Sequence, residues 1–145
     1  MIEAVEGLRF IDTRLRGDDP FKASVPGGIW HALRTDLPED VFPEDVFCVY
    51  QHQAGSDDLG GAGVRIGTSN VYVVRYIGPG SNLEAIETAA GLGDALLHQA
   101  SGTTATGIIY YLLRESANML PEIVNNRLVL SIVQSYRSYV QKAGT

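Results

Sequence analysis

The stretch from Val46 to Ile77 reads VFCVYQHQAGSDDLGGAGVRIGTSNVYVVRYI, and it decides the fold. Two runs of β-branched and aromatic residues, 46–53 and 68–77, enclose a segment that is rich in glycine. Strand-forming runs separated by such turn-forming residues are typical of a β-hairpin. We therefore expect two antiparallel strands, the second starting as early as Gly63, with a long loop over residues 54–66.

The glycine-rich loop does not match a nucleotide-binding motif. Gly55 and Gly60 have the spacing of a P-loop, but Gly61 and Ala62 stand where a lysine and a hydroxyl residue are required. The dinucleotide fingerprint fails as well, because its third glycine is missing and a strand pattern follows. A loop of about a dozen residues is longer than a hairpin needs, so it is either a mobile spacer or a segment used for contact.

Length, charge and cysteine content narrow the classes of protein. The chain has 145 residues, which suit one domain over 1–145 with a true core. Its net charge is -6 and its basic residues are thinly spread, so the footprint of a nucleic-acid binder is missing. Cys48 is the only cysteine and excludes an internal disulfide. With no signal-like start or membrane-length apolar run, we expect a soluble protein made in a reducing compartment, without membrane contact.

Two helices are expected from apolar residues at steps of three and four. The first covers residues 2–15 and ends at the Gly-Asp-Asp-Pro sequence of residues 17–20. The second is capped by Ser81 or Asn82 and runs to about His98, which suits the negative end of a helix.

A second hairpin is expected near the C-terminus. Its strands cover residues 107–114 and 127–141, and residues 121–126 close it. The apolar pattern of the last strand changes character beyond Gln134, which predicts a bulge near Ser135.

The order of these elements indicates the fold class. Between the first helix and the first hairpin, residues 20–43 predict a loop that holds a short edge strand at Gly28–Leu33, anchored by Trp30. Helix, short strand, hairpin, helix and hairpin together predict an α+β fold. We expect a mainly antiparallel four-stranded sheet from two hairpins, with an N-terminal helix and a central helix packed on one face. The opposite face is expected to carry, in some combination, Tyr72, Tyr76, Tyr111, Tyr136 and Tyr139.

The sequence predicts no catalytic, cofactor-binding or metal-binding residues. His31, His52 and His98 fall in different elements, without a second ligand at metal-binding spacing. No serine lies in a G-x-S-x-G elbow, and Cys48 sits in the middle of a strand, where a nucleophile is hard to reach. We therefore expect a protein that is not an enzyme.

Five segments follow one another in a recognisable order: VFCVYQHQAGSDD, RIGTSNVYVVRYIG, LEAIETAAGLGDALLH, IIYYLLRES and RLVLSIVQSYRSYVQ. In element order, strand endings and the ALLH helix end, they resemble the tail-terminator or tail-completion (head-tail joining) proteins of long-tailed bacteriophages. The resemblance covers the chain from about Trp30 to Gln141. One departure is the acidic, proline-marked segment 37–45, which is longer than such proteins usually show.

The resemblance implies a structural virion protein without a cofactor. Its copies would close into a homo-oligomeric ring, most simply a hexamer, at the head-proximal end of the tail tube. Such a ring stops polymerisation of the tail tube protein and joins the tail to the head-tail connector protein. Genomic DNA passes through its centre without specific binding.

The loop over residues 54–66 is then expected to be a docking arm that becomes ordered against a neighbouring ring. Its expected partner contacts are Ser56, Asp57, Asp58, Leu59 and Arg65. Two alternatives remain open. One is another neck or head-tail connector subunit, and the other is a small-molecule-binding α+β domain, which a deep polar pocket would favour.

Overall fold

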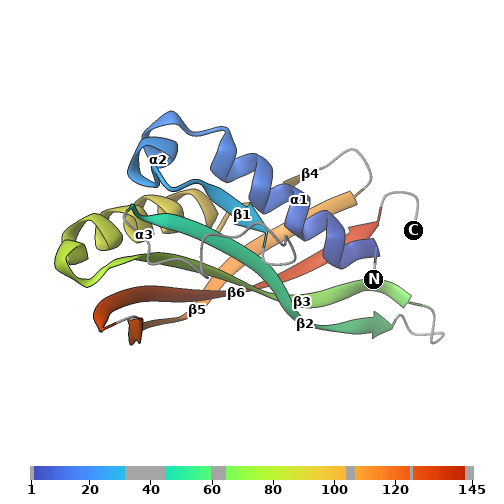
Figure 1. The fold of residues 1–145 in the computed structure, drawn as a ribbon. Coiled ribbons are helices and arrows are strands. Elements are labelled where there is room, and N and C mark those ends of the chain that lie inside the picture. The colour runs from blue at the N-terminus through green and yellow to red at the C-terminus, as the bar shows by residue number, and fades with distance from the viewer. Residues whose placement is uncertain (1, 32–44, 60–64, 104–106, 125, 143–145) are drawn as a thin grey trace.

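A computed structural model of the chain describes residues 2–31, 45–59, 65–103, 107–124 and 126–142 (Figure 1). Within these residues, six strands form one sheet in the order β1-β2-β3-β6-β5-β4. The strands are β1 (Ile29–His31), β2 (Phe47–Leu59), β3 (Arg65–Pro79), β4 (Gly102–Thr103), β5 (Gly107–Val124) and β6 (Arg127–Lys142).

The sheet is mixed but mostly antiparallel. Only β1 and β2 run parallel to each other, and every other pair of neighbouring strands is antiparallel. The two expected hairpins, β2–β3 and β5–β6, form the centre of the sheet, where β3 pairs with β6. The short edge strand expected at Gly28–Leu33 is β1, and the short strand β4, which was not expected, extends the sheet at its other edge. The expected number of four strands in the sheet is therefore too low.

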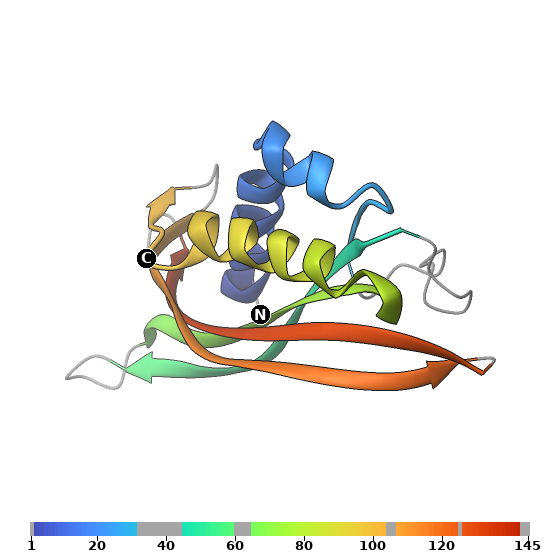
Figure 2. The same ribbon diagram turned by 90° about the vertical axis from the view of Figure 1, so that its left-hand side faces the viewer.

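The helices lie on one face of the sheet, as Figures 1 and 2 show. The first and the last helix along the chain are the two that the sequence predicts, so these helices and the α+β class are confirmed. A single 3-10 turn precedes the last helix. The helical segments are α1 (Ile2–Arg16), α2 (Asp19–Ser24), the 3-10 turn η2 (Gly80–Asn82) and α3 (Leu83–Leu97).

The short helix α2 is not among the expected elements. The Asp18 carboxylate accepts a hydrogen bond from the backbone N–H of Phe21 at 2.9 Å, which caps the start of this helix. Pro20 stands in the first turn, where a missing backbone N–H costs nothing. The residues that end α1 therefore also begin α2, and the new helix buries Phe21 completely.

Tyrosines fill the space between the helices and the sheet. Tyr72, Tyr76 and Tyr136 are fully buried in the main core. Two of them end against helical glycines: a Cβ atom on Gly7 of α1 would lie 1.9 Å from Tyr72 Oη, and one on Gly93 of α3 would lie 1.9 Å from Tyr76 Oη. Both helices therefore need glycine at the point of contact.

The expectation that these tyrosines lie on the face opposite the helices is wrong for Tyr72, Tyr76 and Tyr136. Strand alternation alone cannot say which of the two faces the helices will cover. Tyr111 is instead 43% exposed, opposite Tyr139 on the neighbouring strand.

The second hairpin is longer than expected. β5 continues through Pro121, which pairs with Leu130, so residues 121–126 are not the closing segment. The chain turns after Val124, and Asn126 has a positive φ of 62°. The predicted bulge is present opposite Ser135, but the extra residue lies on β5, between Arg114 and Ser116.

A second, smaller cluster lies on the face of the sheet away from the helices. Phe47, Val49, Ile77 and Val129 are buried there, and Trp30 packs against them. Phe47 and Val49 alternate along β2 with residues of the main core, which places them on the opposite face. The expected role of Trp30 as an anchor is confirmed by this packing.

Candidate interaction surface

The structure places the five predicted contact residues at the far end of the first hairpin. Ser56, Asp57, Asp58 and Leu59 belong to β2, and Arg65 begins β3. Leu59 and Arg65 are cross-strand partners. The strands thus extend into the predicted loop over residues 54–66, of which residues 60–64 lie outside the described part of the chain. Contact with a partner stays a prediction for all five.

A different surface stands out at the other hairpin. The distal part of the second hairpin, Ala117–Val124 of β5 with Arg127–Leu130 of β6, is called the arm here. Along most of the arm β6 still pairs with β3, so β5 is the open edge of the sheet, and only beyond the Pro79–Val129 pair does the arm continue as a two-stranded tip. Figure 2 shows this hairpin running on past the start of α3. Four large apolar side chains of the arm are exposed by 46%, 53%, 73% and 46%: Met119, Leu120, Ile123 and Leu128.

The arm is apolar on both faces. Met119 lies opposite Ile132, which packs against the main core, so Met119 and Ile123 point to the helix side. Leu120 lies opposite Ser131 and points to the other side. Near the tip of the arm, Leu128 pairs with Ile123 and lies against Gly80 of η2. The apolar strip of the core therefore continues outward beyond the helices that cover it.

Sequence reasoning missed this arm because it ended the strand before Pro121. Proline lacks a backbone N–H and is found in sheets on edge strands, at bulges or at strand starts. The signal that could have found the arm is the sequence LPEIVNNRLVL, in which apolar residues flank an Asn-Asn pair on both sides. Asparagine tolerates the positive φ that a tight turn requires.

A polar network ties the end of α3 to the second hairpin. The Tyr136 hydroxyl lies 2.8 Å from Asp94 Oδ1 and 2.9 Å from Gln134 Oε1. Arg114 Nη1 donates to Asp94 Oδ2 at 2.9 Å, and the backbone N–H of Arg114 donates to His98 Nδ1 at 3.0 Å. Burial, followed by the hydrogen bond to Asp94, raises the pKa of Tyr136, so its hydroxyl keeps its proton at neutral pH.

His98 is the C-cap residue of α3, which confirms its expected place at the helix end. Its Nδ1 accepts a hydrogen bond from the backbone N–H of Arg114, and two arginines lie near the same helix end. Arg14 Nε and Nη2 donate to the Leu96 carbonyl oxygen at 3.1 and 2.9 Å, and Arg114 reaches Asp94. The network fixes the helix end to the sheet and presents no activated nucleophile.

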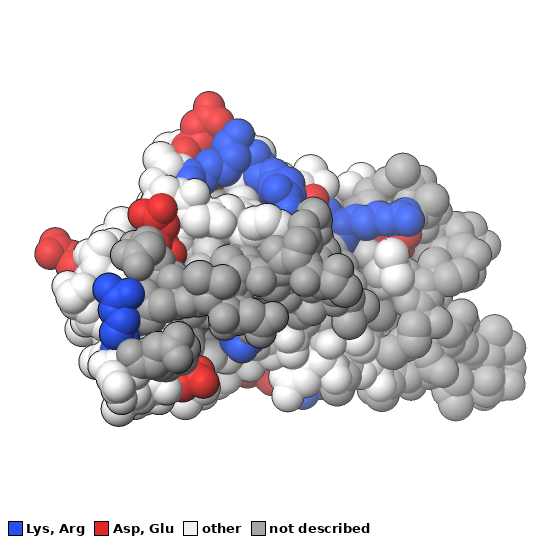
Figure 3. Space-filling model, in the orientation of Figure 1, with Lys and Arg blue, Asp and Glu red and all other residues white. Residues whose placement is uncertain are grey.

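Basic side chains gather over α1 and α2, with acidic ones beside them (Figure 3). Arg9 pairs with Glu6 at 3.1 Å. Arg16 pairs with Asp12 at 2.7 Å, and Lys22 pairs with Asp19 at 3.1 Å. These neighbours along the helix offset the basic charge, so this face offers little free positive charge to a phosphate backbone.

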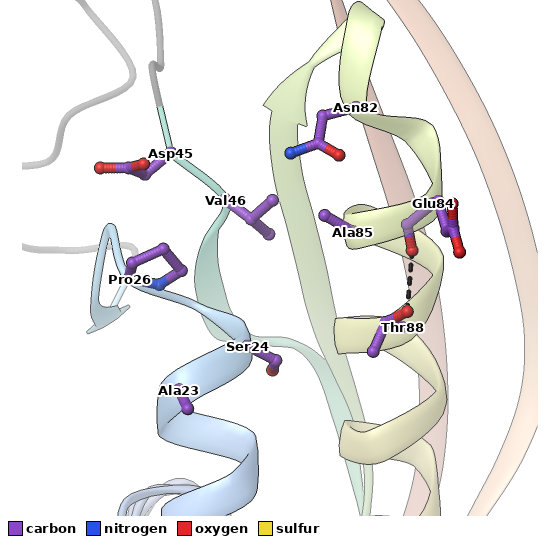
Figure 4. Close-up of a pocket in the computed structure, with 9 residues that line it drawn as sticks. All are labelled: Ala23, Ser24, Pro26, Asp45, Val46, Asn82, Glu84, Ala85 and Thr88. Atoms are coloured by element: carbon purple, nitrogen blue, oxygen red, sulfur yellow. Dashed lines mark hydrogen bonds between the residues drawn. The ribbon is translucent and has the colours of Figure 1, made fainter.

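A pocket of about 430 Å³ opens between α2, the residues before β2 and the first turn of α3 (Figure 4). The Ser24 hydroxyl donates to a carbonyl of α2 at 2.6 Å, and the Thr88 hydroxyl donates to the Glu84 carbonyl at 2.9 Å. Asp45, Asn82 and Glu84 complete its polar lining. The described residues that line it include no lysine, arginine, histidine or cysteine, and both hydroxyls donate to backbone carbonyls.

The remaining candidate groups are structural. Cys48 is fully buried, and burial raises the pKa of its thiol, which keeps it in the unreactive form. Within the described ranges, no three histidine, cysteine, aspartate or glutamate side chains come close enough to share a metal ion. No helix in the same ranges is both long and apolar enough to cross a membrane.

Comparison with solved structures shows that the fold has been seen before. A chain in the solved structure of the virion of a native gene transfer agent particle superimposes with a TM-score of 0.67 at 16% identity, covering 90% of this chain and 91% of that one. A second solved protein, which has no descriptive name, superimposes with a TM-score of 0.52 at 17% identity, covering 90% and 92%. No protein-family model and no curated protein matches the sequence. At these identities the likeness is one of fold.

Proposed function

We propose that this chain is a structural subunit of a phage-like virion, whose copies form a hexameric ring at the head-proximal end of the tail tube. The observation that carries the proposal is the fold shared, over 90% of this chain, with a chain of the gene transfer agent virion. The order of segments that resembles tail-terminator proteins supports the position at the end of the tube.

In this role the ring ends polymerisation of the tube protein, joins the tail to the head-tail connector and lets DNA pass through its lumen. The net charge of -6 supports a passage without binding, because a negative wall does not hold the phosphate backbone. The paired charges on α1 and α2 agree with this, since their basic groups already have acidic neighbours.

The tip of the β2–β3 hairpin is the part that we propose docks on the neighbouring ring, through Ser56, Asp57, Asp58, Leu59 and Arg65. The hairpin places this tip at one end of the sheet (Figure 1). Replacing Asp57 and Asp58 together by lysine tests the docking. A matched charge control is Glu84→Lys/Glu87→Lys, at two exposed positions of α3.

The proposal is tested in assembled particles. With the gene disrupted, we expect tails that are overlong or not attached to heads, and with it present we expect the protein at the tail end in a cryo-electron microscopy map. The Asp57→Lys/Asp58→Lys variant should fold but fail to join tails to heads, whereas Glu84→Lys/Glu87→Lys should assemble normally. Functional particles without the protein would refute the proposal.

A second candidate is another subunit of the head-tail connector. A shared fold within a virion fits it equally, because the match identifies the particle and not the position in it. Co-purification separates the two: binding to the tail tube protein supports the terminator, and binding only to a portal-side protein supports the connector.

A further inference from the structure

Exposed apolar side chains are concentrated on one strand of the described structure. Of the seven large hydrophobic residues that it exposes, five lie on β5 and a sixth, Leu128, lies beside them on β6. The seventh is Val5, on α1. The five on β5 are Tyr111, Leu113, Met119, Leu120 and Ile123.

These side chains emerge from both faces of the sheet. Tyr111 and Leu113 lie opposite Tyr139 and Arg137, on the face without helices, and Leu120 points the same way. Met119 and Ile123 point to the helix side, where they are 46% and 73% exposed. A flat partner covers one face only, so an occupant that buries both sets must enclose the hairpin from two sides.

The free edge of β5 favours side-chain packing over extended strand pairing. β4 pairs with β5 only at Ile108 and Ile109, and no other described strand borders that edge. Pro121 has no backbone N–H to donate, and the extra residue between Arg114 and Ser116 bends the strand. Prolines and bulges are the devices by which proteins stop an edge from pairing along its length.

The exposed apolar side chains form two surfaces that meet along one strand. The six clustered residues are each between 41% and 73% exposed. Standard protein–protein interfaces bury about 800 Å² on each partner. Only a partner that contacts both surfaces at once would bury all six side chains.

Charge indicates what kind of partner the arm takes. Residues 117–130 hold one acid, Glu122, and one base, Arg127, whereas the whole chain has a net charge of -6. Copies of an acidic chain repel each other over most of their surface, and they meet at the lowest electrostatic cost where the surface is neutral and apolar. The arm is such a surface.

We propose that the arm, together with Tyr111 and Leu113 on the same strand, is the contact between copies of this chain. In the ring, which the inference takes from the proposed function, each arm is enclosed by the neighbouring subunit. A closed ring needs contacts between unlike patches on successive subunits, so the arm is one patch and the surface that encloses it is the other.

Single charged substitutions in the arm test the contact. Ile123→Asp and Leu120→Asp each place a carboxylate in the contact, whereas Val5→Asp makes the same change at a similarly exposed site on α1. Native mass spectrometry and sedimentation over a wide concentration range measure self-association, and the thermal midpoint checks the fold. We expect the native chain and Val5→Asp to associate alike, and both arm variants to associate at least about 30-fold more weakly.

A photo-crosslinking residue at position 123, with the same residue at position 5 as control, identifies the occupant directly. Crosslinks from position 123 to peptides of this chain support the proposal. A native chain that stays monomeric at every concentration, crosslinks from position 123 only to another protein, or arm variants that associate like the native chain would each overturn it.

The outcomes separate this inference from the proposed function. Arm-dependent association of a protein that is absent from particles would leave the inference standing and refute the virion role. A ring in the particle whose assembly is untouched by Ile123→Asp would do the reverse. An arm-dependent dimer without larger species would support the contact and count against a ring.

Discussion

The two halves of the β5–β6 hairpin differ in what covers them. Near the C-terminal end of α3, Leu112 of β5 is fully buried, whereas Ile123 on the same strand is 73% exposed. Both belong to one strand with alternating side chains, and both point to the helix side of the sheet, opposite Ser138 and Leu128 of β6. The difference teaches that strand pattern builds the hairpin, while the helical layer decides which half becomes core and which half stays available for contact.

The largest expected effect comes from an alanine substitution of one aliphatic residue in each half. Leu112→Ala should lower the free energy of unfolding by about 2–5 kcal/mol, because it leaves a cavity under the helices. Ile123→Ala should change it by less than about 0.5 kcal/mol. Urea denaturation at low protein concentration, where association does not add to stability, measures both. Equal losses would contradict the division into a covered half and an arm.

Two glycines of α3 extend the comparison to the helix itself, because one faces the buried core and the other faces solvent. Gly93→Ala should cost about 1–3 kcal/mol, because the new methyl group would overlap the Tyr76 hydroxyl at 1.9 Å. Gly91→Ala should stabilise by up to about 1 kcal/mol, since it is exposed and a Cβ there meets nothing within 4 Å. If both variants unfold at the same denaturant concentration, the close contact with Tyr76 is refuted.

Two buried tyrosines provide the next test. Tyr136→Phe should cost about 1–3 kcal/mol, because Asp94 and Gln134 lose their hydroxyl partner. The Tyr76 hydroxyl makes no hydrogen bond with the described residues, so Tyr76→Phe should be neutral or stabilising by up to about 1 kcal/mol. Thermal unfolding of the two variants in one buffer compares them, and the opposite order would contradict the network.

The last prediction concerns how stability depends on pH, an effect of two buried tyrosines that appears only in alkali. Burial raises the pKa of Tyr72 and Tyr136 above the value of about 10 that tyrosine has in unfolded chains. Their contribution to stability is therefore complete below about pH 10 and is lost as the pH rises further, because the unfolded chain releases these protons first. Tyr136→Phe should show a shallower loss of stability above pH 10 than the native chain. Parallel curves would contradict this assignment.

Local pattern was enough for the long elements. The steps of three and four in α1 and α3, and the strand-like runs of β2, β3 and β6, predict elements that the structure confirms, because repeating burial on one side leaves a period in the sequence. The sequence predictions differ most from the structure at residues whose structural role is ambiguous. Asp18 and Pro20 end one helix and start another, and Pro121 lies inside an edge strand instead of ending it.

The candidate surface was predicted only in part. The sequence pointed to the tip of the first hairpin, where a partner contact stays a prediction for Ser56 through Arg65. It missed the arm, because exposure of Ile123 depends on how far α3 extends over the sheet, which no local pattern contains.

The sequence by itself determined the α+β class, the two hairpins, two of the helices and the acidic charge. Those properties follow from composition and from periods of two and 3.6 residues, which are local. Only the tertiary structure decided that the short strand β4 lies at the second edge of the sheet, and that Tyr72, Tyr76 and Tyr136 lie under the helices. It alone left Met119, Leu120 and Ile123 of the arm exposed. The physical reason is that burial depends on neighbours distant in the chain, and the same alternation of side chains serves equally for a face that is covered and for one that is not.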